Sequence, residues 1–465
     1  MTLFDLPVWL VLPFLFTLGA VIGSFLNVCI YRIPQHEGFW ESLQSLVSPP
    51  SSCPNCRTLI PTRDNIPILG WFILGGRCRF CRQQFSIRYA LVELLNASLF
   101  VLVYWMEIPG NVQAGIQGSC LYTSLGPQGF PGSEWLSPSA ILMWRYIYHM
   151  VLIEALVVAT FIDFDLRIIP DGATLPAMAV GVIGAGLIGQ VHLVPAWFQR
   201  SDLSHFITMI YDVWGNGVPP TWLKNASGWW WMSGTGVPGW FVKYPHWHGL
   251  LVSLAGLLVG GGIVWLVRFV GHLVLRQEAM GFGDVILLAM IGSFLGWQAA
   301  VMIFIIAPVI ALIVVAVTWL FFPQREIPYG PYLSIAALIV IVGWKWLWQV
   351  FEHVFELGPI LPFFAIAMAL GLYVLLQCSQ LVKWCLGIDL YPPEWTEAWT
   401  SADQLSYQAM EQVDPQQGRW RHAEWPGSAA GSGQLHTNNW KQPASDLRCN
   451  GWTQHWNRRP GSSLR

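Results

Sequence analysis

Long apolar runs constrain the fold of this chain more than any other feature. Nine of them are candidates for membrane spans, at about 6–30, 89–106, 140–162, 173–191, 250–275, 285–297, 299–322, 332–348 and 360–382. A helix needs about 20 apolar residues to cross a bilayer, so the run at 285–297 is marginal. We therefore predict an all-α polytopic membrane protein with eight or nine transmembrane helices.

The scarcity of charge excludes other classes of protein. Only 11% of the 465 residues are charged and 54% are hydrophobic, whereas soluble domains carry about 25% charged residues. The net charge of −2 gives no attraction toward a polyanion, so we expect no nucleic-acid partner. The partner that this composition predicts is the lipid bilayer.

The positions of the arginines predict the orientation. Seven arginines lie in 32–88, whereas 107–139 contains no Lys or Arg. Positively charged loops remain on the cytoplasmic side of a membrane, so we place 32–88 inside and 107–139 outside. The resulting segments are a first span (1–31), a cytoplasmic loop (32–88), a second span (89–106), an outside Gly-rich loop (107–139), a pair of spans (140–191), a Trp-rich outside insertion (192–248), a second group of spans (249–350), an extra span (351–390) and a mostly disordered cytoplasmic tail (391–465).

Four cysteines in the cytoplasmic loop form two Cys-x2-Cys pairs separated by 21 residues, namely Cys53, Cys56, Cys78 and Cys81. Such pairs typically bring four thiolates to one tetrahedral Zn²⁺ ion. Disulfides rarely persist in the cytoplasm, so a redox pair is the lesser alternative. We expect a structural zinc site that stabilises a loop too small to have its own core.

Two aspartates lie at predicted inner ends of spans. Asp163 belongs to the segment 161–171, and Asp284 ends a Gly-x-Gly-Asp motif at 281–284. Carboxylates at a membrane boundary are costly unless they have a function or a partner. Two that converge can share one proton and act as acid and base on a water molecule. Asp165 and Asp171 are rivals for the role of Asp163, and Asp171 after a proline is typical of a helix N-cap.

Glycines flank the second aspartate on its N-terminal side. Gly281 and Gly283 remove side chains beside Asp284, so a substrate backbone can approach closely there. Glu93 also lies inside a span, which makes it a candidate for function. With Asn27 and Arg88 it could shape a cofactor or substrate pocket near the cysteine loop, although hydrogen-bonded packing explains it equally well.

Several ordered blocks of this sequence together resemble the type IV prepilin peptidases, which are bifunctional leader peptidases and N-methyltransferases. The blocks lie at 23–34, 53–56, 64–67, 76–81, 86–89, 92–93, 162–171, 280–284 and 328–333. The resemblance implies that Asp163 and Asp284 are the catalytic pair of a GxGD aspartyl protease. It also implies a multi-pass protein of the inner membrane that removes a short basic leader from pilin and pseudopilin precursors of type IV pili and type II secretion. The active site would face the cytoplasm.

The same resemblance implies that the new N-terminus is methylated with S-adenosylmethionine in the region around the cysteine loop, but the residues do not locate that cofactor's site. About 120 residues separate the two aspartates, more than is usual in the family, because the Trp-rich insertion lies between them. Its tryptophans favour an interfacial belt, with a glycan- or partner-binding surface as the alternative. Two other functions remain open: an intramembrane protease acting on transmembrane substrates, and a non-catalytic assembly factor that uses the zinc loop.

Overall fold

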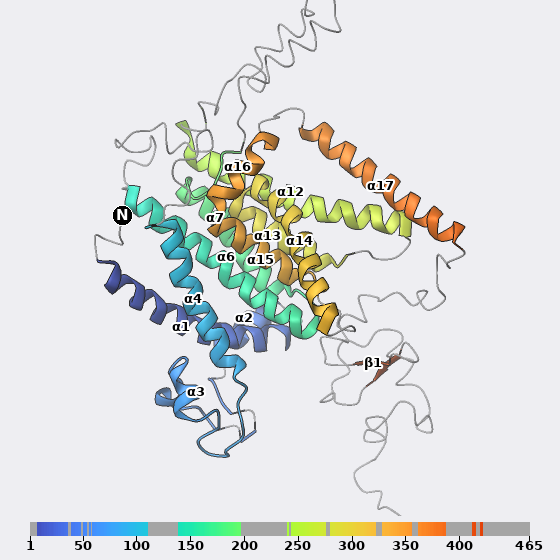
Figure 1. Ribbon diagram of the computed structural model, residues 1–465. Coiled ribbons are helices and arrows are strands. Elements are labelled where there is room, and N and C mark those ends of the chain that lie inside the picture. Colours follow the sequence, from blue (N-terminus) through green and yellow to red (C-terminus); the bar gives the residue numbers. More distant parts are fainter. Residues whose placement is uncertain are drawn as a thin grey trace, which may run out of the picture.

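The computed structural model of the chain is a bundle of long helices from which a small loop domain extends at one end (Figure 1). It describes residues 7–35, 39–47, 50–53, 55–56, 58–109, 138–196, 240, 243–275, 280–321, 328–355, 361–386, 412–414 and 419–421. The helices are α1 (Val8–Arg32), α2 (Phe39–Val47), α3 (Leu69–Ile73), α4 (Arg88–Glu107), α6 (Pro138–Leu166), α7 (Asp171–Ile188), α12 (Pro245–Leu275), α13 (Phe282–Leu295), α14 (Trp297–Phe321), α15 (Gly330–Val342), α16 (Trp344–Phe355) and α17 (Leu361–Cys385).

The helices confirm the predicted fold class. Within the described ranges, seven helices are long and apolar enough to cross a membrane, or up to eight if the bent pair α15 and α16 forms one span. The marginal run at 285–297 becomes α13, which has only 14 residues. Two short strands, β1 (Gln412–Asp414) and β2 (Arg419–Arg421), pair antiparallel in the tail. The Gly-rich loop at 110–137, the Trp-rich insertion at 197–239 and most of the tail lie outside the described residues.

One expected span contains a sharp bend. The run at 332–348 is not straight, because the chain breaks at Gly343 and α16 leaves α15 at 97°. Hydropathy alone does not register this break, since both helices are apolar where they meet. In α16 the indoles of Trp344 and Trp348 are fully buried and stack with ring centroids 5.1 Å apart. The aromatic face of α16 therefore packs onto the bundle after the bend.

Glycines bring α12 and α13 into backbone contact at the centre of the bundle. A Cβ atom at Gly256 would overlap the carbonyl oxygen of Gly292, and one at Gly260 would lie 2.5 Å from the Leu288 carbonyl oxygen. The hydroxyl of Ser253 donates to the Ser293 carbonyl oxygen at 2.7 Å. Small residues at such a crossing permit close packing between membrane helices. As a result α13, although short, is held firmly and buried along its length.

The loop domain is attached to the bundle in two ways: by its two ends, which continue into the packed helices α1 and α4, and through α2. The side chain of Asn96 in α4 donates to the Gly19 carbonyl oxygen of α1 at 2.9 Å, so these helices lie side by side. At the other attachment, α2 lies against the start of α7, where a Cβ at Gly172 would come 3.2 Å from the Ser42 hydroxyl oxygen. Figure 1 shows α2 and α3 together at one end of the bundle.

Candidate active site

Asp163 lies in the last turn of α6, where the helix is about to end. Arg167 adopts a left-handed conformation with φ of 56°, and its N–H donates to the Asp163 carbonyl oxygen at 2.9 Å. A left-handed residue directly after the last turn is a common way of ending a helix. The chain then runs extended to Pro170, which precedes α7. This sharp reversal leaves the Asp163 side chain facing the interior of the bundle, with only 5% of the residue exposed.

Asp284 lies in the first turn of α13, three residues after Gly281, the extended residue that precedes the helix. The N–H of Gly281 donates to the Asp284 carboxylate. A side chain at this third helical position commonly accepts the N–H of the capping residue, and the helix dipole favours its negative charge. The helix N-terminus therefore holds a buried carboxylate, since only 9% of Asp284 is exposed to solvent.

The turn before α15 completes the site. The N–H of Gly330 donates to the Asp163 carboxylate, and Tyr329 interacts electrostatically with Asp284. A Cβ at Gly330 would overlap Asp163 Oδ2 and lie 3.2 Å from Ile169 Cδ1. Glycine at this position thus lets the α15 backbone approach the first carboxylate closely. The sequence analysis noted this turn as part of a resemblance but gave it no role.

The structure brings Asp163 and Asp284 close enough for their charges to repel each other. Both carboxylates are buried, which adds a cost to ionising either of them. Two adjacent buried carboxylates favour a state in which they share one proton. That state offers a base to activate water and an acid to protonate a leaving group.

The rival aspartates lie elsewhere. Both carboxylate oxygens of Asp165 pair with the guanidinium of Arg88, each at 2.7 Å, and this pair links α6 to the start of α4. Asp171 is the first residue of α7, while Pro170 takes the capping position that had been expected for Asp171. Of the three aspartates in this segment, Asp163 is the one whose carboxylate is affected by the charge of Asp284.

The two flanking glycines have different surroundings. A Cβ at Gly283 would lie 3.0 Å from the Cβ of Ile169, so this glycine accommodates the extended segment before α7. At Gly281 the nearest atom to such a Cβ would be Asp284 Oδ2 at 3.6 Å, an ordinary contact. A Cβ would therefore fit beside the second carboxylate at Gly281, whereas at Gly283 it would press on Ile169.

The four cysteines of the loop domain converge as a metal site requires. Their sulfur atoms lie within 4.8 Å of one another, and Cys53 Sγ is 3.7 Å from Cys81 Sγ. Four thiolates about 2.3 Å from one Zn²⁺ ion in tetrahedral geometry are about 3.8 Å apart, so the arrangement fits zinc. Each pair lies in a tight turn, closed by hydrogen bonds from Cys53 N–H to Thr58 and from Cys78 N–H to Gln83.

An ion pair supports the loop beside the cysteines. Arg79 donates from Nε to Asp64 Oδ2 at 2.7 Å and from a terminal nitrogen to Oδ1 at 2.5 Å. This bidentate guanidinium lowers the pKa of the Asp64 carboxyl below its usual value. The pair joins the second cysteine turn to the segment between the two turns, so it holds the halves of the loop together.

Comparison with known proteins gives consistent matches. Residues 17–107 match the family model of the bacterial peptidase A24 N-terminal domain, and residues 229–316 match the model of the type IV leader peptidase family. The second match contains Asp284, whereas Asp163 lies between the two matches. No solved structure matches the chain.

Three curated relatives cover most of the chain. A type 4 prepilin-like proteins leader peptide-processing enzyme of Escherichia coli O78:H11 is 30% identical over 71% of this chain and 93% of its own length. Prepilin leader peptidase/N-methyltransferases of Aeromonas hydrophila and Neisseria gonorrhoeae are 28% and 26% identical, each over 72% of this chain, and 91% and 92% of their own lengths are covered. This chain belongs to the type IV leader peptidase family.

Proposed function

We propose that this membrane protein is an aspartic endopeptidase that removes the leader from type IV prepilin-like precursors and then N-methylates the new N-terminus. The observation that carries the peptidase proposal is that two buried carboxylates from separate helices, Asp163 and Asp284, lie near enough for the charge of one to affect the other, on either side of Ile169, which packs against both Gly283 and Gly330. Such a pair suits the attack of water on an amide, because one carboxylate can take a proton while the other supplies one.

The position of the pair favours leader cleavage over the two alternatives. Asp163 is three residues from the end of α6, and Asp284 is in the first turn of α13. Because α6 is long enough to cross a membrane, its end is expected near the membrane boundary, where the leader of a precursor would enter, whereas an intramembrane protease needs its carboxylates deep in the bilayer. A non-catalytic assembly factor would have no reason to place two buried carboxylates against each other.

We infer that both activities face the cytoplasm and that the protein lies in the inner membrane. The support is the arginine-rich loop domain, which by charge belongs on the cytoplasmic side. The ion pair between Arg88 and Asp165 connects this loop domain to the end of α6 that carries Asp163. Both candidate sites therefore lie at the same end of the bundle. The four cysteines would hold a structural Zn²⁺ ion there, and S-adenosylmethionine would supply the methyl group.

Co-expression with a prepilin in cells that lack other prepilin peptidases tests the proposal. We expect the intact protein to shorten the precursor to its mature mass plus one added methyl group, as measured by mass spectrometry. Asp163→Ala and Asp284→Ala should leave the leader attached. Asp165→Asn is the matched control, because it alters a neighbouring carboxylate that pairs with Arg88, and it should process the precursor. Leader removal by either alanine variant would refute the assigned catalytic pair.

A further inference from the structure

A short extended segment, residues 167–170, joins α6 to α7 shortly after Asp163. Arg167 turns the chain out of α6 with a φ of 56°, and Pro170 is extended, with φ of −76° and ψ of 141°. Ile169 precedes this proline, and a residue before proline is restricted to extended conformations because it would otherwise clash with the proline ring. The sequence itself therefore keeps the backbone between the two helices open, like a short piece of β-strand.

The middle of this segment has unused backbone hydrogen-bonding groups. At its two ends the groups are paired: the Arg167 N–H donates to the Asp163 carbonyl oxygen at 2.9 Å, and the Pro170 carbonyl oxygen accepts the Ala173 N–H at 3.1 Å. Between them, the N–H and C=O groups of residues 168 and 169 form no hydrogen bond within the described part of the chain. Both residues are only half-buried. Such unpaired backbone is equivalent to the open edge of a β-sheet, which another strand can join.

The side chain of Ile169 fixes the segment against both halves of the aspartate site. A Cβ at Gly283 would lie 3.0 Å from the Cβ of Ile169, and one at Gly330 would lie 3.2 Å from its Cδ1. Gly283 directly precedes Asp284, and the N–H of Gly330 donates to the Asp163 carboxylate. A peptide that lies along the segment would therefore pass both carboxylates, as a chain that is to be cleaved must do.

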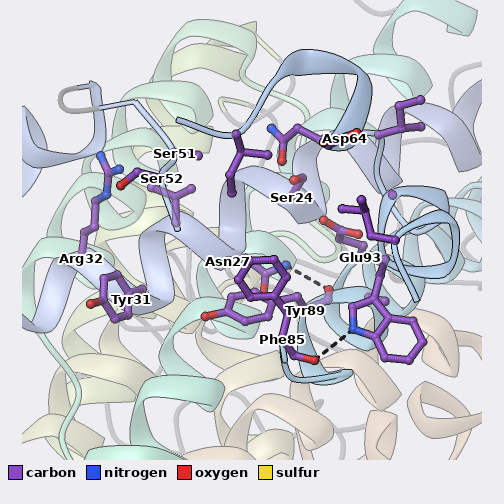
Figure 2. Close-up of a pocket in the computed structure, with 18 of the residues that line it drawn as sticks. Ser24, Asn27, Tyr31, Arg32, Ser51, Ser52, Asp64, Phe85, Tyr89 and Glu93 are labelled. Atoms are coloured by element: carbon purple, nitrogen blue, oxygen red, sulfur yellow. Dashed lines mark hydrogen bonds between the residues drawn. The ribbon is translucent and has the colours of Figure 1, made fainter. Parts of the chain in front are cut away.

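Beyond its proline, the segment leads toward a large cavity beside the loop domain, with a volume of about 970 Å³. Gly172 at the start of α7 lies against α2, since a Cβ there would come 3.2 Å from the Ser42 hydroxyl oxygen. The same helix lines the cavity, where Arg32 donates to the Ser45 carbonyl oxygen at 2.6 Å. Figure 2 shows Arg32 on the side of the cavity opposite Glu93. The segment thus lies between the aspartate pair and the α2 wall of this cavity.

We propose that the backbone of Ile168 and Ile169 binds the substrate, because a stretch of the precursor around the bond to be cleaved adds to this segment as an extended β-strand. Main-chain hydrogen bonds then hold the peptide, and other contacts supply the selectivity for side chains. Successive residues of a strand direct their N–H and C=O groups to opposite edges. This role rests on the proposed leader cleavage, to which it adds a binding site for the peptide backbone.

Single backbone changes in the enzyme test the assignment. The full-length protein is synthesised in a cell-free system into lipid nanodiscs with the hydroxy-acid analogue of isoleucine at position 168 or 169. This turns one amide into an ester, removes one N–H and keeps the side chain. Since neither N–H is bonded within the described part of the chain, the melting temperature should not change. The control is the corresponding ester at Phe363, an exposed residue in the first turn of α17, where N–H groups have no intrahelical partner.

The readout is the affinity for a fluorescent prepilin peptide that spans the leader junction and has a reduced, uncleavable scissile bond. At least one of the esters at 168 and 169 should weaken binding about 10-fold, as expected when one hydrogen bond is lost. The ester at Phe363 should bind the peptide as the wild type does.

A matching scan of the peptide tests the strand geometry. N-methyl groups that block one backbone N–H at a time should weaken binding to the wild-type protein about 10-fold or more at every second residue near the reduced bond. The residues between should show little effect, because their N–H groups face the other edge of the strand.

Three results would overturn the assignment: wild-type affinity with both esters, a scan without alternation, or no peptide binding by a wild-type protein that cleaves a prepilin. Failure of the proposed function looks different. A protein that binds the peptide with the alternating pattern but leaves every prepilin intact would contradict the proposed cleavage and not the strand. A protein that neither binds the peptide nor cleaves a prepilin would contradict both.

Discussion

Replacing Gly330 with alanine is expected to disable leader cleavage while leaving the fold intact. The new Cβ would overlap Asp163 Oδ2 and lie 3.3 Å from Asp163 Cγ and 3.2 Å from Ile169 Cδ1. The backbone at Gly330 does not need glycine, because its φ is not positive. The overlap must therefore be relieved by moving the carboxylate, by about 1 Å. A displacement of about 1 Å in a catalytic geometry can cost about 100-fold in rate.

The assay is the rate of leader removal from a purified prepilin in detergent, with the melting temperature of each variant measured in parallel. Gly262→Ala is the matched control, because a Cβ at that position in α12 meets nothing within 4 Å. We expect Gly330→Ala to lose about 100-fold in kcat with little change in melting temperature, and Gly262→Ala to keep the wild-type rate. A wild-type rate in Gly330→Ala would refute the placement of Asp163 against this turn.

Three further predictions concern the parts that support the site. Chelation of zinc, or Cys78→Ser, should expose the loop domain to limited proteolysis while the melting temperature of the helical bundle changes little, because the metal replaces the loop's missing core. Arg79 lowers the pKa of Asp64, so the ionised carboxylate stabilises the loop above the usual Asp pKa of about 3.9 and loses that effect as the pH falls through the lowered pKa. The loop of the wild type should therefore be cleaved more slowly by protease than the loop of Asp64→Asn. This difference in cleavage rate should be largest at about pH 6 and should shrink below about pH 4. Gly256→Ala should lower the melting temperature at a cost of about 1–3 kcal/mol, because its Cβ overlaps Gly292, whereas Gly262→Ala should not; equal melting temperatures would contradict the close packing of α12 and α13.

Local patterns predicted the parts of the molecule that depend on short stretches of chain. The spacing of the four cysteines was sufficient to predict their convergence, because each pair lies in its own tight turn. The apolar runs predicted the helices because hydropathy, too, is a property of a short stretch of chain. Asp284 was identifiable from the Gly-x-Gly-Asp motif, which is a local pattern. Its position in the first turn of a helix is also local, because the helix N-terminus stabilises a carboxylate there.

Features that depend on packing could not be read from the sequence. Without the family resemblance, the residues left Asp165 as a rival of Asp163, and the reversal at Arg167 and the pairing of Asp165 with Arg88 distinguish the two. The contact between Gly330 and Asp163 joins residues far apart in sequence, so no local signal reports it. The bend at Gly343 was missed because hydropathy averages over it.

The most direct test of the central claim is a double-mutant cycle on the two carboxylates. The rate of prepilin cleavage is measured for wild type, Asp163→Asn, Asp284→Asn and the double variant, all purified and checked for zinc content. Groups that act as a unit are strongly non-additive, so we predict that each single variant is essentially inactive and that the double variant is no slower than the worse single variant. Losses that multiply in the double variant, or a single variant that keeps more than about a tenth of the wild-type rate, a loss of less than 1.4 kcal/mol, would contradict a catalytic pair formed by Asp163 and Asp284.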